Sequence, residues 1–314
     1  MQVHPTTSVS DVAHYLSSWK KNRAENLWGH LIHLIERSRR HNPYDPSAHR
    51  SSAERDQVTD HALMWEEQTG INFPMMYVAS IYLYYFAQSH GCDTFLFATR
   101  DCCHWVRIFK KLFPQATAHY FHCSRNMLER AAREHNTHYK KYVQSLLRST
   151  PDKTIFIDIH GTCQRALTYF ADEFHQTPYC FLLSSSYREY AEFPGICQKA
   201  HQEGKMINVV FDARGTPIEM LNFDIQGTIQ NFVAKGPVRD PPEYSINRLE
   251  AYHACIQALV KHMKPWDRVI PKSLRNKKLP FELEELLTLI RRIYRVIQDN
   301  KPVLNNYIKH PGKH

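Results

Sequence analysis

Three short polar segments each follow an apolar run of strand length, and their side chains have the chemistry to bind a phosphorylated sugar. The clearest is the segment from Asp158 to Arg165. Gly161 and Thr162 would open a helix there, whose free N–H groups and dipole attract an anion. Gly161 would let the backbone approach a phosphate, and Asp158 would accept hydrogen bonds from sugar hydroxyls or hold a metal ion through water. His160 lies inside the same turn. The alternative is a tight turn with a helix cap and no ligand.

The other two polar segments add charges of both signs. Arg100 and Asp101 follow the apolar run 94–98, and Ser124 and Arg125 follow the next such run. An arginine in this position can bind phosphate through two parallel hydrogen bonds. An aspartate there can bind magnesium or accept a proton from an attacking hydroxyl. The alternatives are a surface ion pair for the first segment and a helix cap beside a solvated charge for the second.

The elements that must position these segments alternate along the chain. Short apolar runs predict strands, and helical spacing of apolar residues between the runs predicts helices. The runs cover residues 94–98, 119–123, 154–159 and 179–183. This alternation predicts an α/β fold with a parallel sheet flanked by helices. Because ligands of such sheets bind beyond the carboxyl ends of the strands, we expect the three polar segments at one edge, where they could share a site.

Helices are also expected before and after the sheet. The apolar spacing is helical over residues 11–40, 74–90, 245–263 and 281–297. Residues 41–56 are polar and predict a loop. The predicted organisation is an N-terminal helical extension, an α/β core and a C-terminal helical segment, over residues 1–60, 61–240 and 241–314.

Composition narrows the classes of function. The formal net charge of +9 suits an anionic ligand, such as a phosphorylated substrate, a membrane surface or nucleic acid, or else belongs to a solvated basic surface. The eight cysteines form no C-x-x-C pair, which indicates free buried thiols in a reducing compartment. Residues 1–10 are too polar for a signal peptide, and residues 73–87 are too short and polar to cross a bilayer alone. P-loop and dinucleotide-binding motifs are absent. We expect a cytoplasmic protein, peripheral to a membrane if it contacts one.

Several segments, in order, resemble one known family. Residues 95–102 resemble a strand that ends in Arg-Asp-Gly, residues 123–125 a Ser-Arg turn, and residues 156–167 an Asp-Ile-Gly-x-x-Gly-[Ser/Thr] turn. Weaker similarities, to a lead-in helix and a late glutamate segment, cover residues 67–74, 218–221 and 226–228. These motifs are those of the domain that accompanies haloacid-dehalogenase-type phosphatase domains in bacterial polysaccharide biosynthesis proteins.

That domain resembles a phosphoribosyltransferase fold. The resemblance implies transfer of a ribofuranosyl group from phosphoribosyl pyrophosphate to a glycan acceptor, after which a separate phosphatase would remove the 5-phosphate. Catalysis would depend on Arg100, Asp101 and Asp158, and the two aspartates would hold Mg²⁺ through water. Glu219 would lie on the acceptor side. The implied contacts of the donor 5-phosphate are His160, Gly161, Thr162, Cys163, Gln164 and Arg165. Those of its pyrophosphate are Thr99, Arg100, Ser124 and Arg125.

The chain departs from the family in two places. Cys102 stands where the family has glycine, and a side chain there would hinder close approach of the backbone to pyrophosphate. The turn after Asp158 is shorter and contains His160. Two other functions therefore stay open. One is an enzyme that uses a nucleotide sugar, either a glycosyltransferase or a phosphohydrolase. The other is a non-catalytic module that binds a phosphorylated ligand or RNA.

Overall fold

The apolar runs and amphipathic segments of the sequence are folded into two compact units in a computed structural model of the chain. The described residues are residue 16 and residues 28–44, 52–212, 217–244, 246–270 and 282–299. Much of the predicted helix 11–40 and the end of the chain lie outside them. Unit 1 comprises Met1–Tyr82, Arg107–Pro114 and Ile246–His314, and unit 2 comprises Leu83–Val106 and Gln115–Ser245. The predicted boundaries after residues 60 and 240 stay predictions.

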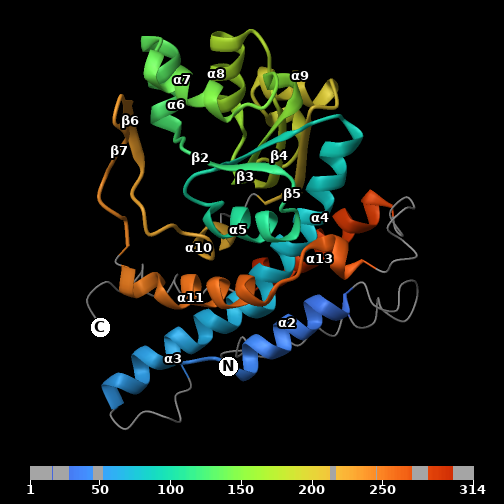
Figure 1. Cartoon of the computed structure of the whole chain (residues 1–314), viewed down its shortest axis with the longest axis vertical. Coiled ribbons are helices and arrows are strands. Elements are labelled where there is room, and N and C mark those ends of the chain that lie inside the picture. The colour runs from blue at the N-terminus through green and yellow to red at the C-terminus, as the bar shows by residue number, and fades with distance from the viewer. Residues whose placement is uncertain are drawn as a thin grey trace. The chain divides into compact units, whose positions relative to one another are not determined.

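Unit 2 is built on five parallel strands in the order β2-β1-β3-β4-β5 (Figure 1). They are β1 Thr94–Ala98, β2 Thr117–Phe121, β3 Thr154–His160, β4 Tyr179–Ser185 and β5 Met206–Phe211. Nearly every side chain of β1, β3 and β4 is buried, as expected of a parallel sheet that is covered on both faces. The predicted α/β fold, with a parallel sheet flanked by helices, is confirmed.

The strand order decides which helices cover which face. The chain passes from β1 to β2 through α5 (Cys103–Leu112), then reverses direction and reaches β3, β4 and β5 in turn. The returning helices are α6 Arg125–Glu134, α7 Thr137–Leu146, α8 Gln164–Phe174 and α9 Gly195–Gln202. Because parallel crossovers are right-handed, the reversal puts α5 on the opposite face from these helices. Trp105 of α5 accordingly packs against Phe97 and Phe181, with ring centroids 5.7 Å apart in both pairs, whereas α6–α9 pack on Leu96 and Phe156.

A hairpin follows the sheet in the chain. Helix α10 (Pro217–Met220) leads to β6 (Ile229–Val233) and β7 (Gly236–Arg239), and β6 lies beside α6 and α7 (Figure 1). The rings of Phe232 and Tyr142 stack with centroids 4.6 Å apart, and Asn136 donates a hydrogen bond of 3.0 Å to the Phe232 carbonyl oxygen. A Cβ at Gly227 would lie 1.7 Å from the carbonyl oxygen of Asp240, so only glycine fits there.

Unit 1 is helical. Its helices are α2 Gly29–Arg40, α3 Ser52–Glu67, the π-helical turn Gln68–Asn72, α11 Ile246–His262, α12 Trp266–Val269 and α13 Leu283–Asp299. Helices α4 (Phe73–Ser89) and α5 contribute residues to both units. The helical additions expected before and after the sheet are present. Helix α3 begins at Ser52, inside the predicted loop 41–56, so that loop is shorter than the sequence indicates.

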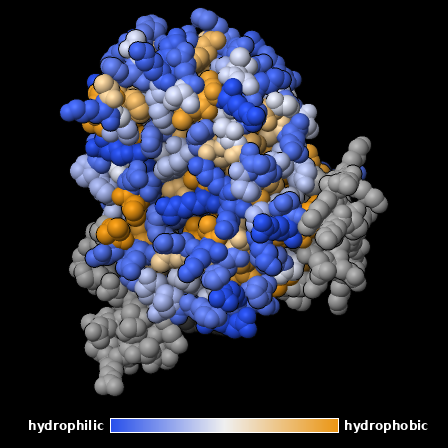
Figure 2. Space-filling view, in the orientation of Figure 1, coloured by the Kyte–Doolittle hydropathy of each residue, from blue (hydrophilic) through white to orange (hydrophobic). Residues whose placement is uncertain are grey.

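The surface and the cysteines agree with the composition. Hydrophilic residues cover most of the face drawn in Figure 2, where hydrophobic residues form small separate patches. All eight cysteines lie in the described part of the chain, and each is buried with a free thiol. None of the described helices has the length and apolar character needed to cross a membrane.

Candidate functional site

A cleft of about 400 Å³ lies in unit 2, beyond the carboxyl ends of β1, β2 and β3. The strand order reverses between β1 and β3, and ligands of doubly wound sheets bind at this switch point. The walls come from the turns after these three strands, from α10 and from β6. Every residue to which the sequence analysis assigns a catalytic or ligand-binding role lines this cleft: Thr99, Arg100, Asp101, Ser124, Arg125, Asp158, His160, Gly161, Thr162, Cys163, Gln164, Arg165 and Glu219.

The turn after β1 is held from behind by hydrogen bonds. Thr99 Oγ1 donates to the carbonyl oxygen of Cys123 at 2.6 Å and accepts from its N–H at 3.1 Å, which ties the end of β1 to the end of β2. The peptide bond between Thr99 and Arg100 is cis. The hydroxyl of Tyr120 donates to the Asp224 carboxylate at 2.5 Å and lies 3.2 Å from the Arg100 carbonyl oxygen. These bonds fix the backbone from which Arg100 projects.

Cys102 does not obstruct the cleft. Its side chain is fully buried, and its Sγ lies 3.6 Å from the carbonyl oxygen of Ile157 on the neighbouring strand. The thiol is directed into the sheet core, and Cys102 is not part of the cleft wall, so the hindrance expected at this position stays a prediction.

The turn after β3 brings the start of α8 to the cleft. Gly161 has φ +154°, and a Cβ there would lie 3.3 Å from Asp158 Oδ2. Cys163, the N-cap residue, has a left-handed backbone with φ 57°, and Thr162 Oγ1 accepts a hydrogen bond of 3.2 Å from the N–H of Gln164. The first turn of a helix leaves N–H groups without partners in the helix, so this end of α8 suits an anion.

His160 and Ser124 line the cleft, but their side chains are used for structure. The ring nitrogens of His160 lie 2.9 Å from Ser184 Oγ and 2.8 Å from Ser186 Oγ, and burial lowers the pKa of this histidine. Ser124 Oγ caps α6 by accepting from the Met127 N–H at 3.1 Å, and it donates to a carbonyl oxygen of β6 at 2.5 Å. The imidazole and the hydroxyl are therefore poorly placed to bind phosphate directly.

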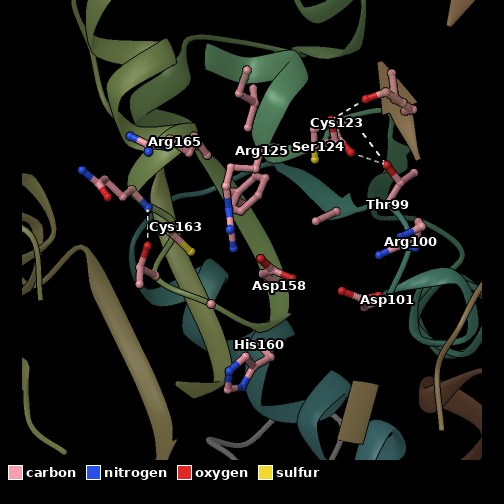
Figure 3. Close-up of a pocket in the computed structure, with 18 of the residues that line it drawn as sticks. Thr99, Arg100, Asp101, Cys123, Ser124, Arg125, Asp158, His160, Cys163 and Arg165 are labelled. Carbon is pink, nitrogen blue, oxygen red and sulfur yellow. Dashed lines mark hydrogen bonds between the residues drawn. The ribbon is translucent and has the colours of Figure 1, made fainter. Parts of the chain in front are cut away.

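Three carboxylates gather in the cleft, those of Asp101, Asp158 and Glu219. Figure 3 shows the first two directed toward the same space. Burial and the charge of Glu219 raise the pKa of Asp158 to about 7, although N–H groups at the end of β3 oppose this. Burial and the charges of Glu219 and Asp158 raise the pKa of Asp101 well above its usual range. Asp101 Oδ1 is buried and has no hydrogen-bond partner in the described structure. Such a group of oxygens either shares protons near neutral pH or fits a hard cation such as Mg²⁺.

Three arginines also line the cleft, Arg100, Arg125 and Arg165. Arg125 points toward Asp158 (Figure 3), and its positive charge partly offsets the rise in the pKa of Asp158. Within the described residues no carboxylate forms an ion pair with Arg125. Arg100 Nη1 donates to Glu243 Oε2 at 2.7 Å, and Arg165 is paired with a glutamate of α6. Glu243 is 51% exposed, so a phosphate could replace it at little cost.

Some residues that hold the turn after β1 in place have no recognisable signal in the sequence. Tyr120, Asp224 and Glu243 carry no motif, and only the folded chain brings them to the turn after β1. The cap at Ser124 is different, because a serine before a helix is a recognisable signal.

No protein-family model matches the chain, and no curated protein matches it either.

Proposed function

We propose that the protein transfers a phosphoribosyl group from phosphoribosyl pyrophosphate to a glycan acceptor, with Mg²⁺ as cofactor. One observation carries this proposal: carboxylates, arginines and the start of a helix converge on one cleft at the carboxyl edge of the sheet. A sugar with phosphate at both ends needs all three kinds of group. The carboxylates would hold the sugar hydroxyls and the cation, and the helix start and arginines would hold the two anionic ends.

The turn after β3 supports binding of the 5-phosphate. The dipole of α8 favours an anion at its first turn, and Gly161 adds no Cβ between that turn and Asp158. Thr162 and Arg165 line the same wall of the cleft, where Arg165 is paired with Glu129. The ring of His160 would take no part, because its nitrogens are bound to serines.

The opposite wall supports binding of pyrophosphate. Arg125 is available to an anion, and Arg100 becomes available when it releases Glu243. Two phosphates next to Asp101 and Asp158 would be repelled unless a cation lay between them. These aspartates and Glu219 offer the oxygen ligands that Mg²⁺ prefers. When bound, Mg²⁺ would neutralise negative charge on the departing pyrophosphate.

The proposed reaction is a displacement at the anomeric carbon. An acceptor oxygen forms a bond to this carbon while the bond to the pyrophosphate oxygen breaks, and pyrophosphate leaves with the electron pair. Asp158 holds the ribose hydroxyls, and its negative charge stabilises the positive charge that develops on the sugar ring. Asp101, in its ionised form, takes the proton of the acceptor hydroxyl, and Glu219 lines the acceptor side. The product keeps its 5-phosphate, so a separate phosphatase is the expected partner.

The direct test is release of pyrophosphate by the purified protein from phosphoribosyl pyrophosphate and Mg²⁺, first with water and then with glycan acceptors. We expect release that requires Mg²⁺ and is lost in Asp158→Asn, and a mass increase of an acceptor by one phosphoribosyl group. Asp172→Asn is the matched control, because this exposed residue of α8 lies outside the cleft.

The two alternatives give different results in the same test. Donor binding without release would favour a non-catalytic module, and RNA binding that falls steeply with salt would favour RNA as its ligand. Tighter binding of a nucleotide sugar than of phosphoribosyl pyrophosphate would favour the other enzyme class. Release that is unaffected by Asp158→Asn would refute the proposed site.

A further inference from the structure

A small pocket in unit 1, between α2, α3 and α11, combines an apolar floor with a cationic rim. Its volume is about 130 Å³. Leu34, Trp65 and Leu259 form the floor and are 1%, 3% and 2% exposed. Apolar cavities of roughly 150 Å³ bind benzene, so a compact organic group fits this space.

The polar atoms of the floor are already satisfied. The indole N–H of Trp65 donates to the carbonyl oxygen of Ser38 at 3.1 Å, and Ser38 Oγ lies 2.8 Å from Thr69 Oγ1. A polar group that entered the floor would lose its water and gain no partner there, which is unfavourable. The part of a ligand that occupies the floor must therefore be apolar.

The rim carries positive charge. Arg37 and His41 come from the end of α2, and His262 comes from the end of α11. Burial and the charges of Arg37, Lys261 and His41 lower the pKa of His262, so the lasting positive charge of the rim is that of Arg37. Among the described residues, no carboxylate lines the pocket and none pairs with Arg37. An anion at the rim would pair with the Arg37 guanidinium.

From this arrangement we infer that the pocket binds a small phosphate monoester whose organic group is apolar and about the size of a phenyl ring. The organic group occupies the floor, and the phosphate meets Arg37, His41 and His262 at the rim. A phosphate suits this rim because it can accept two parallel hydrogen bonds from the planar guanidinium of Arg37 and another from the N–H of a neighbouring imidazole. The inference concerns unit 1 and does not depend on the proposed transferase function.

Phenyl phosphate is the probe, with inorganic phosphate and phenol as its charged and apolar halves. Binding is followed in the full chain by the NMR signal of the Trp65 indole N–H, identified by its loss in Trp65→Phe. We expect phenyl phosphate to bind at least about tenfold more tightly than either half, because it alone uses both the floor and the rim. Equal affinity for phenyl phosphate and inorganic phosphate, or for phenyl phosphate and phenol, would overturn the inference.

Two pairs of variants locate the binding. Ala258→Leu fills the pocket, whereas Gln257→Leu adds the same side chain at an exposed neighbouring position of α11. Arg37→Gln removes a rim charge, whereas Arg40→Gln removes an exposed charge of the same helix that does not line the pocket. We expect the first variant of each pair to weaken phenyl phosphate binding about tenfold or more and the second to leave it unchanged. Equal effects within either pair would refute the site.

Discussion

The cleft in unit 2 and the pocket in unit 1 differ in the charged side chains that line them. The cleft is about 400 Å³ and is lined by both carboxylates and arginines. The pocket is about 130 Å³, and among the described residues its apolar floor is bordered by Arg37 and two histidines, without any acid. The cleft therefore suits a ligand that brings both anions and a metal ion, while the pocket suits an anion with an apolar group.

The largest effect is expected at the centre of the cleft. Asp158→Asn should lower pyrophosphate release by about 10²- to 10³-fold or more, because the neutral amide no longer stabilises positive charge on the sugar ring. Steady-state rates of release measure this, with Asp172→Asn as the unchanged control. A normal rate in Asp158→Asn would mean that the reaction does not take place in the cleft.

Removal of an arginine should have the next largest effect. Arg100→Ala should lower the kcat/KM for phosphoribosyl pyrophosphate by about 10²-fold, because the leaving group loses a charge-assisted contact. Arg133→Ala removes an exposed charge of α6 that does not line the cleft and should change nothing. If both variants lose activity equally, the effect is one of overall charge rather than of the site.

A smaller effect should follow from a single added methyl group. Gly161→Ala places a Cβ 3.3 Å from Asp158 Oδ2 in a backbone conformation that alanine rarely adopts, so donor affinity should fall about tenfold. Gly195→Ala is the matched control, because a Cβ there meets nothing within 4 Å. Calorimetric titration with the donor measures both. Unaltered affinity in Gly161→Ala would mean that the turn does not contact phosphate.

The pH dependence of stability should also distinguish the two sites. Folding raises the pKa of Asp158 from 3.8 to about 7, so between these values the folded chain keeps a proton that the unfolded chain has lost. Stability contributed by this group is therefore present below the lower value and falls as pH rises toward 7. Mg²⁺ should oppose this loss, so its effect on Tm should be larger at pH 8 than at pH 6.

Scanning calorimetry with and without Mg²⁺ at the two pH values measures this effect. The increase in Tm should disappear in Asp158→Asn and persist in Ala258→Leu, which alters only the pocket. An increase that is the same at both pH values, or that Asp158→Asn retains, would place the metal elsewhere.

The smallest effect on turnover is expected from His160→Asn. Its ring is bound to Ser184 and Ser186, so the variant should lower Tm by a few degrees and change turnover less than about threefold. Thermal unfolding and release assays measure the two effects. A large loss of donor affinity with an unchanged Tm would instead support the direct phosphate contact that the sequence suggests.

Much of the sheet could be predicted from the sequence because its strands are continuous apolar runs. The first strand is predicted without error at residues 94–98, and the third ends one residue later than predicted, at His160. Because the strands are parallel, the polar segments after them had to meet at one edge. Helix α3 begins at Ser52, inside the loop predicted over residues 41–56. The start of this helix could not be predicted because its polar residues hide the helical period.

The rest of the site depends on contacts between residues far apart in the chain. Tyr120 and Asp224 are 104 residues apart, and the local sequence around them gives no indication that they form a hydrogen bond beside Arg100. The orientation of His160 follows from Ser184 on β4 and Ser186 just after it, which no pattern in the turn of His160 reveals. The roles assigned to Asp101, Asp158 and Glu219 stay predictions, whereas their position in one cleft is a property of the fold.

Calorimetric titration of phosphoribosyl pyrophosphate into the protein at pH 8, with and without Mg²⁺, tests the central claim most directly. The chain and Ala258→Leu should each bind one donor molecule, only when Mg²⁺ is present, and Asp158→Asn should bind none. Binding without Mg²⁺, binding that Asp158→Asn keeps, or no binding by the unaltered chain would contradict a metal-dependent sugar phosphate site in the cleft.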